Sequence, residues 1–513
     1  TRLTKTHCFP EFTCRVCPAL CEAACTCNLD SQPVSTKENE RAIIETAYAN
    51  GWVTPRIPKV RTGKKVAVVG SGPSGLATAM QLNRRGHQVT VSERIGGLLR
   101  YGIPNMKLDK SVIDRRIKLM EEEGVVFKTG VDVGKDITAK ELQKDFDRIV
   151  LCCGASNPRD IKVPGREANN IFFAVDYLSS ITKSLLDSNF KDKNFVSAKG
   201  KHVVVIGGGN VAIDVARTST RVGDYNVSMF CLEDRKGMPA SEEEVEEALE
   251  EGVKLDCGWG PKEILTEDGH VTGIVLKRCI SVKDADGRFN PQYDENDLKT
   301  INCRHVFLSI GQSTIWGELL KGTKVQVDGV RVKADKLTYQ TTDPDIFIGG
   351  DVYTGPRFAI DAIAAGKEAA ISIHRYVQPH SSLTIGRNRR EFIELDKNNI
   401  SIESYDNSSR QVPGTDTSFN HKKSFKDAKL TFTEEQVKKE TARCLGCGAS
   451  VVDPNKCIGC GICTTKCEFD AIHLNRELPE CSTMRKSEDK LKYILHYGAK
   501  QAIKIKFAGK KNK

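Results

Sequence analysis

The sequence predicts an α/β protein in which two Rossmann-like dinucleotide-binding domains lie between two cysteine-rich segments. Two segments, beginning at Lys65 and at His202, each combine an apolar strand, a glycine-rich turn and a helix. Twelve of the 19 cysteines lie in two clusters, Cys8–Cys27 and Cys444–Cys467, which predict metal binding at both ends of the chain. A chain of 513 residues is long enough for about three to five domains.

Composition and charge exclude several classes of protein. With 39% apolar and 28% charged residues, the sequence is neither collagen-like nor of low complexity nor wholly disordered. Lysine and arginine exceed aspartate and glutamate by 77 − 67 = 10, but basic stripes interleaved with aromatic residues are absent, so no nucleic-acid partner is expected. No run of 18 uncharged apolar residues and no secretory signal occur, so we expect no membrane span. Clustered cysteines beside nucleotide motifs favour metal binding in a reducing compartment, which predicts a cytoplasmic protein.

The first glycine-rich turn follows the predicted strand Lys65–Val69 and has the sequence Gly70-Ser-Gly72-Pro-Ser-Gly75. Gly70 allows the tight turn, Gly72 lets the backbone approach a pyrophosphate, and Gly75 lets the helix pack on the strand. The N-terminus of the helix then faces the phosphates. Glu93 ends the next predicted strand, where a carboxylate can accept hydrogen bonds from ribose hydroxyls.

The second turn follows the predicted strand His202–Ile206 and has the GxGxxA form, with Ala212 as the small packing residue. Its predicted cofactor-binding residues are Gly207, Gly208, Gly209, Asn210 and Val211, together with Gly311. Two dinucleotide folds predict two dinucleotides, and redox logic makes one a flavin and the other a nicotinamide. A flavin converts two-electron hydride chemistry into one-electron steps that iron–sulfur clusters can accept.

A third segment supports the flavin. Residues 345–351 form an apolar strand that ends in Gly349-Gly350-Asp351 at the start of a helix. A carboxylate at Asp351 can hold a ribityl hydroxyl, and backbone N–H groups near Ala359 and Ile360 can face the flavin ring. The alternative is that Asp351 only caps the helix.

The remaining pattern predicts further elements. A helix is expected over Glu38–Ala49. Ser241 and Glu244 have capping-box spacing for a helix over Glu242–Glu251. Residues 254–310 alternate like strands.

The C-terminal cysteines have the C-x2-C-x2-C-x3-C spacing of bacterial ferredoxins, with Glu468 in place of the usual proline. The ligands predicted from this run are Cys457, Cys460, Cys463 and Cys467. Thiolates at this spacing on a glycine-containing loop can converge on one [4Fe-4S] cube, and zinc is the alternative metal. In two-cluster ferredoxins the fourth cysteine serves the other cluster, so Cys467 can join Cys444 and Cys447 around a second cube. Cys481 is a candidate for its fourth ligand.

Five segments carry a resemblance to a known family. They are Phe9-Pro-Glu-Phe-Thr13, Arg15–Glu22, Gly96-Gly-Leu-Leu-Arg-Tyr-Gly-Ile-Pro104, Met238-Pro-Ala240 and Gly349-Gly-Asp351. They resemble the small subunit of glutamate synthase, a module that also occurs in dihydropyrimidine dehydrogenase and in electron-bifurcating ferredoxin:NADP oxidoreductases. The resemblance covers residues 1 to about 380. It implies a glutathione-reductase-like FAD domain, interrupted by a nicotinamide domain and preceded by a helical iron–sulfur domain. The residues that it assigns to the flavin or to the crossing between the domains are Gly97, Leu98, Arg100 and Gly154.

The chain departs from this family at the nicotinamide site. NADP-type members carry a Tyr-Arg-Arg stretch before Met-Pro-Ala, and its arginines grip the 2′-phosphate. Aligned on Met238, this chain has Leu232 and Glu233 at those positions. A carboxylate at Glu233 would repel a 2′-phosphate and accept a hydrogen bond from a free ribose 2′-OH, which favours NAD(H) over NADP(H). Arg235 remains and can still reach a phosphate.

The N-terminal cluster departs from the family as well. The family's metal ligands that match this chain are Cys17, Cys21, Cys25 and Glu40. The family's upstream run of four cysteines is absent and the chain starts with Thr1, so we expect that upstream ligands are missing or that other cysteines replace them. Cys8, Cys14 and Cys27 stand where the family usually has no cysteine, and they either rebuild a site or are buried thiols.

These features predict five regions. They are a helical iron–sulfur domain over 1–60, an FAD-binding domain over 61–195 and 336–380, an NAD(P)-binding domain over 196–335, a linker over 381–430 and a ferredoxin-like α+β domain over 431–513. We expect an oxidoreductase subunit that moves hydride between NAD(H) and FAD, and single electrons through [4Fe-4S] clusters to or from a partner subunit or a ferredoxin. The rivals are an NADPH-dependent glutamate synthase small subunit and a non-enzymatic scaffold. No acid–base catalyst is expected, because hydride transfer needs mainly positioning.

Overall fold

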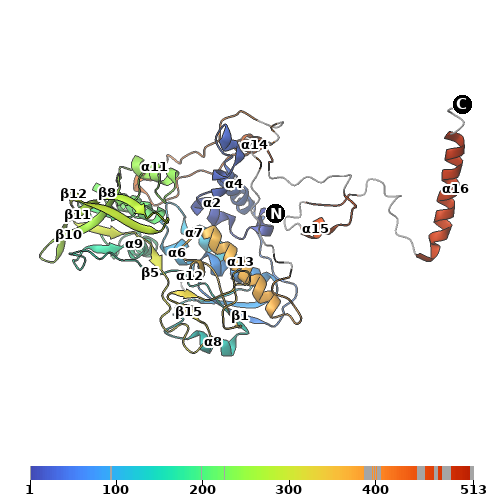
Figure 1. Cartoon of the computed structure of the whole chain (residues 1–513), viewed down its shortest axis with the longest axis horizontal. Coiled ribbons are helices and arrows are strands. Elements are labelled where there is room, and N and C mark those ends of the chain that lie inside the picture. The colour runs from blue at the N-terminus through green and yellow to red at the C-terminus, as the bar shows by residue number, and fades with distance from the viewer. Residues whose placement is uncertain are drawn as a thin grey trace. The chain divides into compact units, whose positions relative to one another are not determined.

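The structure is a computed structural model of the chain. It describes residues 2–92, 95–197, 199–223, 226–385, 406–447, 457–466, 472–475 and 487–508, with single residues at 387, 396, 398, 400 and 402. By its internal contacts the chain divides into a larger unit, Cys8–Ala449, and a smaller unit that combines Thr1–His7 with Ser450–Lys513. The larger unit contains two five-stranded parallel sheets, as two Rossmann-like domains require. Figure 1 labels β1 of the first sheet and β8 of the second.

The first sheet carries the first glycine turn. Its strands are parallel in the order β17-β4-β1-β2-β3, with bounds β1 Lys65–Val69, β2 Gln88–Ser92, β3 Val126–Lys128, β4 Arg148–Leu151 and β17 Ile346–Ile348. Its helices are α5 Pro73–Arg84, α6 Gly97–Tyr101, α7 Lys110–Glu122, α8 Ala139–Asp145, α12 Asp351–Thr354 and α13 Ala359–Tyr376. β1 is buried from Val66 to Val69, as expected for a central strand covered by helices on both faces.

The second sheet carries the second glycine turn. Its parallel strands have the order β6-β13-β7-β8-β9, with bounds β6 Ile171–Phe173, β7 His202–Ile206, β8 Asn226–Cys231, β9 Lys254–Cys257 and β13 His305–Leu308. Its helices are α9 Ala174–Ser188, α10 Asn210–Val222 and α11 Glu242–Glu250. An antiparallel sheet adjoins β8 (Figure 1) and consists of β10 Trp259–Glu267, β11 His270–Lys283 and β12 Phe289–Asn302. The predicted strands over 254–310 therefore form.

The boundaries of the two α/β domains differ from the expected ones. β6 pairs with β13 in the second sheet, so the second domain begins before residue 171 and not at 196. On the return of the chain, Leu319 and Val332 pack in the core of the first sheet, so the first domain resumes before residue 336. Two short antiparallel pairs lie in these crossings: β5 Asn157–Pro158 with β14 Gln312–Ser313, and β15 Val327–Asp328 with β16 Arg331–Val332. A short apolar strand does not reveal from its own pattern which sheet it joins.

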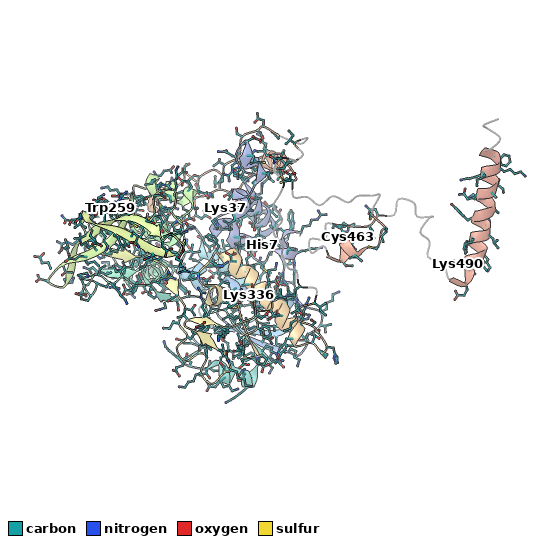
Figure 2. The ribbon with its side chains drawn as sticks, in the orientation of Figure 1. His7, Lys37, Trp259, Lys336, Cys463 and Lys490 are labelled. Carbon is teal, nitrogen blue, oxygen red and sulfur yellow. The ribbon has the colours of Figure 1, made fainter. Side chains whose placement is uncertain are left out.

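The N-terminal part of the larger unit is helical, as expected. Its elements are α2 Pro10–Val16, α3 Leu20–Ala23, η1 Thr26–Leu29 and α4 Thr36–Ala49, and Figure 2 labels Lys37 in the first turn of α4. A buried ion pair between Glu11 and Arg116 joins α2 to α7, and neither side chain is more than 4% exposed. Because removing one partner would leave a buried charge uncompensated, this pair fixes the helical region on the first α/β domain.

Residues 406–447, which we name the strap, pack on the N-terminal helices. The strap contains η2 His421–Lys423 and α14 Glu434–Ala442. Asp427 pairs with Arg15 and Arg41 at 3.4 and 2.9 Å. The fully buried Glu440 accepts a hydrogen bond from the backbone N–H of Ser35 at 2.7 Å. The described part of the expected linker is thus anchored to the body, and residues 431–447 lie in the larger unit rather than in a ferredoxin-like domain.

The predicted helix over Glu242–Glu251 forms as α11, but its capping box does not. Ser241 makes no side-chain capping hydrogen bond. Glu244 instead pairs with Lys107 of the first α/β domain, with 2.7 Å between Nζ and Oε1, and Lys107 also reaches Asp214 at 3.3 Å. Lys107 is a buried ammonium of the first α/β domain, and a buried charge is costly unless it is paired. Its two carboxylate partners, Asp214 and Glu244, belong to the second α/β domain, so Glu244 pairs with Lys107 and does not cap its own helix.

In the smaller unit the described elements are α1 Leu3–Thr6, α15 Ile462–Lys466, η4 Ser487–Asp489 and α16 Lys490–Ala508. Figure 2 labels Cys463 in α15 and Lys490 at the start of α16. Within the described ranges, no helix combines the length and the apolar character needed to cross a bilayer.

Candidate functional site

The first glycine turn contains two packing glycines and one open glycine. A Cβ atom added at Gly70 would lie 2.2 Å from the carbonyl oxygen of Cys152, and one added at Gly75 would lie 1.9 Å from the carbonyl oxygen of Gly70. Gly72 is the N-cap of α5 with φ −68°, and a Cβ atom added there would meet no protein atom within 4 Å. The turn therefore keeps open space at the helix N-terminus, where a pyrophosphate is expected.

The segment assigned to the flavin by resemblance lies against this turn. Gly97 begins α6 with φ +50°, and a Cβ atom added to it would lie 3.0 Å from Cα of Gly72. Arg100 donates from Nε to the carbonyl oxygen of Ile95 at 2.9 Å, and its guanidinium pairs with Asp114. Leu98 is 39% exposed on the first turn of α6. The structure thus brings two separate predicted motifs together.

Sequence reasoning missed Lys110, whose ammonium binds backbone carbonyl oxygens in and just after α6. Its buried ammonium donates to the carbonyl oxygens of Leu99 at 3.1 Å and Ile103 at 2.7 Å. Burial, together with the positive charge of Arg100, lowers the pKa of Lys110 to about 7. The sequence held one signal for this burial: Lys110 lies three residues before the buried Ile113, so both side chains are on the apolar face of α7.

The third motif meets the first through packed helices. Asp351 begins α12, and burial raises the pKa of its carboxyl to about 6. Its Oδ1 accepts a hydrogen bond from the backbone N–H of Arg357 at 3.2 Å. Ala359 and Ile360 form the first turn of α13. A Cβ atom added at Gly366 of α13 would lie 2.2 Å from the carbonyl oxygen of Ser74, so α13 and α5 touch at backbone distance. Two further predicted glycines have positive φ: Gly154 at +72° and Gly350 at +79°.

The second glycine turn repeats this arrangement. A Cβ atom added at Gly207 would lie 2.3 Å from the carbonyl oxygen of Ser309, whereas one added at Gly209 would meet nothing within 4 Å. Asn210 begins α10, and its Oδ1 accepts from the backbone N–H of Ser241 at 3.0 Å, which holds the loop after β8 over the turn. The other residues predicted here are Val211, which is 42% exposed, and Gly311, which has φ +94°.

Glu233 follows β8 and reaches the second turn. A Cβ atom added at Gly208 would lie 3.0 Å from Glu233 Oε2. Arg235, in contrast, pairs with Glu242, with 2.8 Å between Nη1 and Oε2 and both side chains more than a third exposed. An exposed ion pair of this kind contributes at most about 1 kcal/mol to stability, so Arg235 can leave Glu242 at little cost. The charge nearest the turn is therefore acidic.

Among the four matched N-terminal ligands, Cys17 lies within electrostatic reach of Cys21 and Glu40. Burial raises the pKa of the Cys17 thiol, and the charges of Cys21 and Glu40 raise it further. Glu40 Oε1 accepts a hydrogen bond from Thr13 Oγ1 at 2.9 Å. The fourth matched residue, Cys25, lies close to Cys27, and its charge adds to burial in raising the pKa of the Cys27 thiol.

Cys444 and Cys447 lie in the larger unit beside the N-terminal helices. Thr26 Oγ1 lies 3.2 Å from Cys447 Sγ. The Cys27 thiol donates to the carbonyl oxygen of Arg443 at 3.5 Å. Their predicted cluster partners, Cys467 and Cys481, lie outside the described residues, as does Glu93 of the flavin prediction.

The ferredoxin-spaced cysteines lie in the smaller unit. Cys457, Cys460 and Cys463 are exposed, and two glycines between them, Gly459 and Gly461, have φ +66° and +77°. A loop that carries several cysteines and turns at glycines is typical of a segment that binds an iron–sulfur cluster. Within the described residues, no three His, Cys, Asp or Glu side chains already surround one metal position, so the ligand sets stay predictions.

The sequence matches the pyridine nucleotide-disulphide oxidoreductase family over residues 37–145 and 64–366, and the 4Fe-4S binding domain over residues 450–473. It is 42% identical over 403 residues to the glutamate synthase [NADPH] small chain of Bacillus subtilis, covering 74% of this chain and 82% of that one. The chain belongs to the glutamate synthase small-chain family. The predicted family, the α/β fold and the class of enzyme are thereby confirmed: it is an FAD- and iron–sulfur-dependent oxidoreductase.

Members of the glutamate synthase small-chain family differ in the nucleotide after which they are named. The glutamate synthase [NADH] of Schizosaccharomyces pombe is 40% identical over 399 residues, covering 73% of this chain and 19% of that protein. Among solved structures, Mycobacterium tuberculosis FprA in complex with NADPH superposes with a TM-score of 0.51 at 18% identity, covering 61% of this chain and 84% of that one. This likeness shows the fold alone.

Proposed function

We propose that this chain oxidises NADH in the second α/β domain and delivers single electrons through [4Fe-4S] clusters to a partner redox subunit or a ferredoxin in the cytoplasm. Bound FAD supplies the link between hydride transfer and one-electron transfer. The observation that carries the choice of nucleotide is the Glu233 carboxylate at the second glycine turn. The same sites serve the reverse flow of electrons.

Each glycine turn has one proposed role. The turn at Gly72 takes the pyrophosphate of FAD, because an added Cβ atom there meets only open space at the N-terminus of α5. The turn at Gly209 takes the pyrophosphate of the nicotinamide nucleotide, because an added Cβ atom there also meets only open space, at the N-terminus of α10. Asp351 holds a ribityl hydroxyl, and a carboxyl with a raised pKa can serve there as donor or acceptor.

Glu233 selects between the two nicotinamide nucleotides by charge. A 2′-phosphate would stand beside its carboxylate, and juxtaposed like charges at an interface cost several kcal/mol. A free 2′-OH can instead donate a hydrogen bond to the same carboxylate. Arg235 opposes this selection only when it leaves Glu242.

Exchanging these charges tests the proposal. We expect the unmodified chain to reduce a dye faster with NADH than with NADPH, as compared by kcat/KM. Glu233→Arg should reverse much of this preference. Glu242→Gln is the matched control, because it removes a nearby carboxylate and releases Arg235 without altering the turn, and it should shift the preference less. Equal or better kcat/KM with NADPH in the unmodified chain would reject NADH as the substrate.

The second candidate is an NADPH-dependent small subunit of glutamate synthase. It is supported by the printed name of the Bacillus subtilis relative and by the availability of Arg235. Under this candidate NADPH is the better substrate and Arg235→Ala abolishes that advantage, whereas under the NADH proposal Arg235→Ala leaves NADH oxidation nearly unchanged.

A further inference from the structure

The helix α16, Lys490–Ala508, combines lysines with exposed apolar side chains. Residues 490–513 contain eight lysines and no aspartate or glutamate, so they supply most of the chain's net charge of +10. Every large apolar side chain of α16 is exposed, and Leu491 and Ile505 are each 71% exposed. The function proposed above uses neither the charge nor the apolar surface of this helix.

The apolar side chains of α16 are ordered around the helix axis. At 3.6 residues per turn, positions three and four residues apart share one face. One face of α16 carries no lysine, covers about a third of the circumference and is named here the apolar stripe. It consists of Leu491, Ile494, Leu495, Gly498, Ala502 and Ile505. The five lysines of the helix lie outside the stripe, and Ile503 and Phe507 lie among them. A contiguous exposed apolar surface marks an interaction site.

We propose that α16 binds the surface of a bilayer that contains anionic phospholipids. The apolar stripe enters the boundary between headgroups and acyl chains, and the lysines contact the phosphates. Lys490 and Lys506, which border the stripe, extend their aliphatic stems along this boundary and keep their ammonium groups among the headgroups. The helix lies along the surface and does not cross the bilayer, because its lysines are spread over its whole length and a charge at the bilayer centre is costly.

Charge complementarity favours an anionic bilayer over the other occupants of the stripe. In a second copy of the chain the partner helix would also carry only lysines as charged groups, so two packed copies repel each other. Gly498 would also leave a gap in the seam of a coiled coil, where a large apolar residue is needed. A nucleic acid would neutralise the lysines but leave the aliphatic stripe in water. A bilayer with anionic headgroups accommodates both faces of the helix.

Binding of α16 would tether the ferredoxin-spaced cysteines to the membrane. The matched 4Fe-4S segment ends at residue 473, and α16 begins at Lys490. At full extension the chain between them spans at most about 60 Å, so the segment stays within that distance of the bilayer. The binding itself does not depend on which nucleotide the chain oxidises.

Flotation of the full, cofactor-loaded chain with lipid vesicles tests the proposal. We expect the chain to float with vesicles of phosphatidylcholine mixed with phosphatidylserine, to stay behind with phosphatidylcholine alone, and to be released by high salt. A chain that ends at Asp489 should bind neither kind of vesicle. Equal binding to both vesicles, or undiminished binding of the shortened chain, would overturn the proposal.

Two neighbouring substitutions separate the stripe from the charge. Leu495→Asp and His496→Asp introduce the same carboxylate, but Leu495 belongs to the stripe and His496 lies on the far side of the helix. One charge near an anionic surface changes the vesicle affinity by about 5-fold, which is the loss expected for His496→Asp. Leu495→Asp should lose at least about ten times more, because a leucine also leaves the apolar phase.

Both variants should keep the flavin absorption band and the rate of dye reduction by NADH, which report a folded body. Equal losses of vesicle affinity in the two variants would overturn the role of the stripe. A chain that ignores vesicles but dimerises through residues 490–513, or that binds RNA in their place, would overturn the bilayer as the occupant.

Discussion

The two kinds of glycine in the first turn should respond to the same substitution in opposite ways. Gly72→Thr and Gly75→Thr add identical atoms three residues apart. At Gly72 the added Cβ atom meets no protein atom within 4 Å, φ is −68°, and threonine is about as good an N-cap as glycine. At Gly75 the added Cβ atom would stand 1.9 Å from the carbonyl oxygen of Gly70.

The magnitudes follow from these distances. A Cβ atom 1.9 Å from a backbone oxygen forces α5 away from β1, and overpacking of this kind costs about 1–3 kcal/mol or more of folding free energy. Gly72→Thr should leave the stability of the FAD-free protein within about 0.5 kcal/mol, as for an unstrained surface change. If the open space at Gly72 is where the pyrophosphate of FAD binds, the threonine side chain collides with the pyrophosphate. A similar energetic cost then weakens FAD binding and raises its Kd by about 5- to 150-fold.

Two titrations separate these effects. Urea unfolding of FAD-free protein measures stability, and quenching of flavin fluorescence measures Kd. We expect Gly72→Thr to unfold like the unmodified protein and bind FAD weakly, and Gly75→Thr to unfold at lower urea. Unchanged FAD affinity in Gly72→Thr, or unchanged stability in Gly75→Thr, would refute the division into open and packing glycines.

Two further predictions concern pH and the C-terminal segment. Burial lowers the pKa of His305 to about 4 and that of His87 to about 4, so between pH 6.5 and 4 the unfolded chain binds more protons than the folded one and stability falls with falling pH. His305→Phe, which keeps the ring stacked on Phe172, should flatten this dependence in urea unfolding at pH 7 and 5, and an unchanged slope would contradict it. Deleting residues 450–513 should preserve flavin reduction by NADH, remove about four iron atoms per cube and abolish electron delivery to the partner. Undiminished delivery would show that the segment is only structural.

The strand-and-glycine motifs were predictable because their causes are local. β1 and β7 have the predicted bounds, since a buried parallel strand followed by a helix N-terminus leaves an apolar run and fixed glycine positions in the sequence. Membership of the glutamate synthase small-chain family was also predictable from short local motifs. The role of each residue stays a prediction where the structure shows only its position.

Other features depend on long-range pairing and left no local signal. Ser241 and Glu244 have capping-box spacing, but Glu244 pairs with Lys107 of the other domain. The strap resembles a polar linker in sequence, because the partners of Asp427 lie about four hundred residues away. Cys444 is another example: spacing alone pointed to Cys467, whereas the structure places the preceding residue, Arg443, in contact with Cys27, whose thiol donates to its carbonyl oxygen at 3.5 Å.

The central claim is that electrons from NADH enter at the flavin and leave through the clusters. Anaerobic rapid mixing of the full chain with NADH, followed by flavin absorbance and by electron paramagnetic resonance of frozen samples, tests it most directly. The account predicts that the flavin band bleaches first, faster with NADH than with NADPH, and that reduced-cluster signals follow. A flavin band that stays oxidised with both nucleotides, or clusters that remain oxidised after the flavin has bleached, would contradict it.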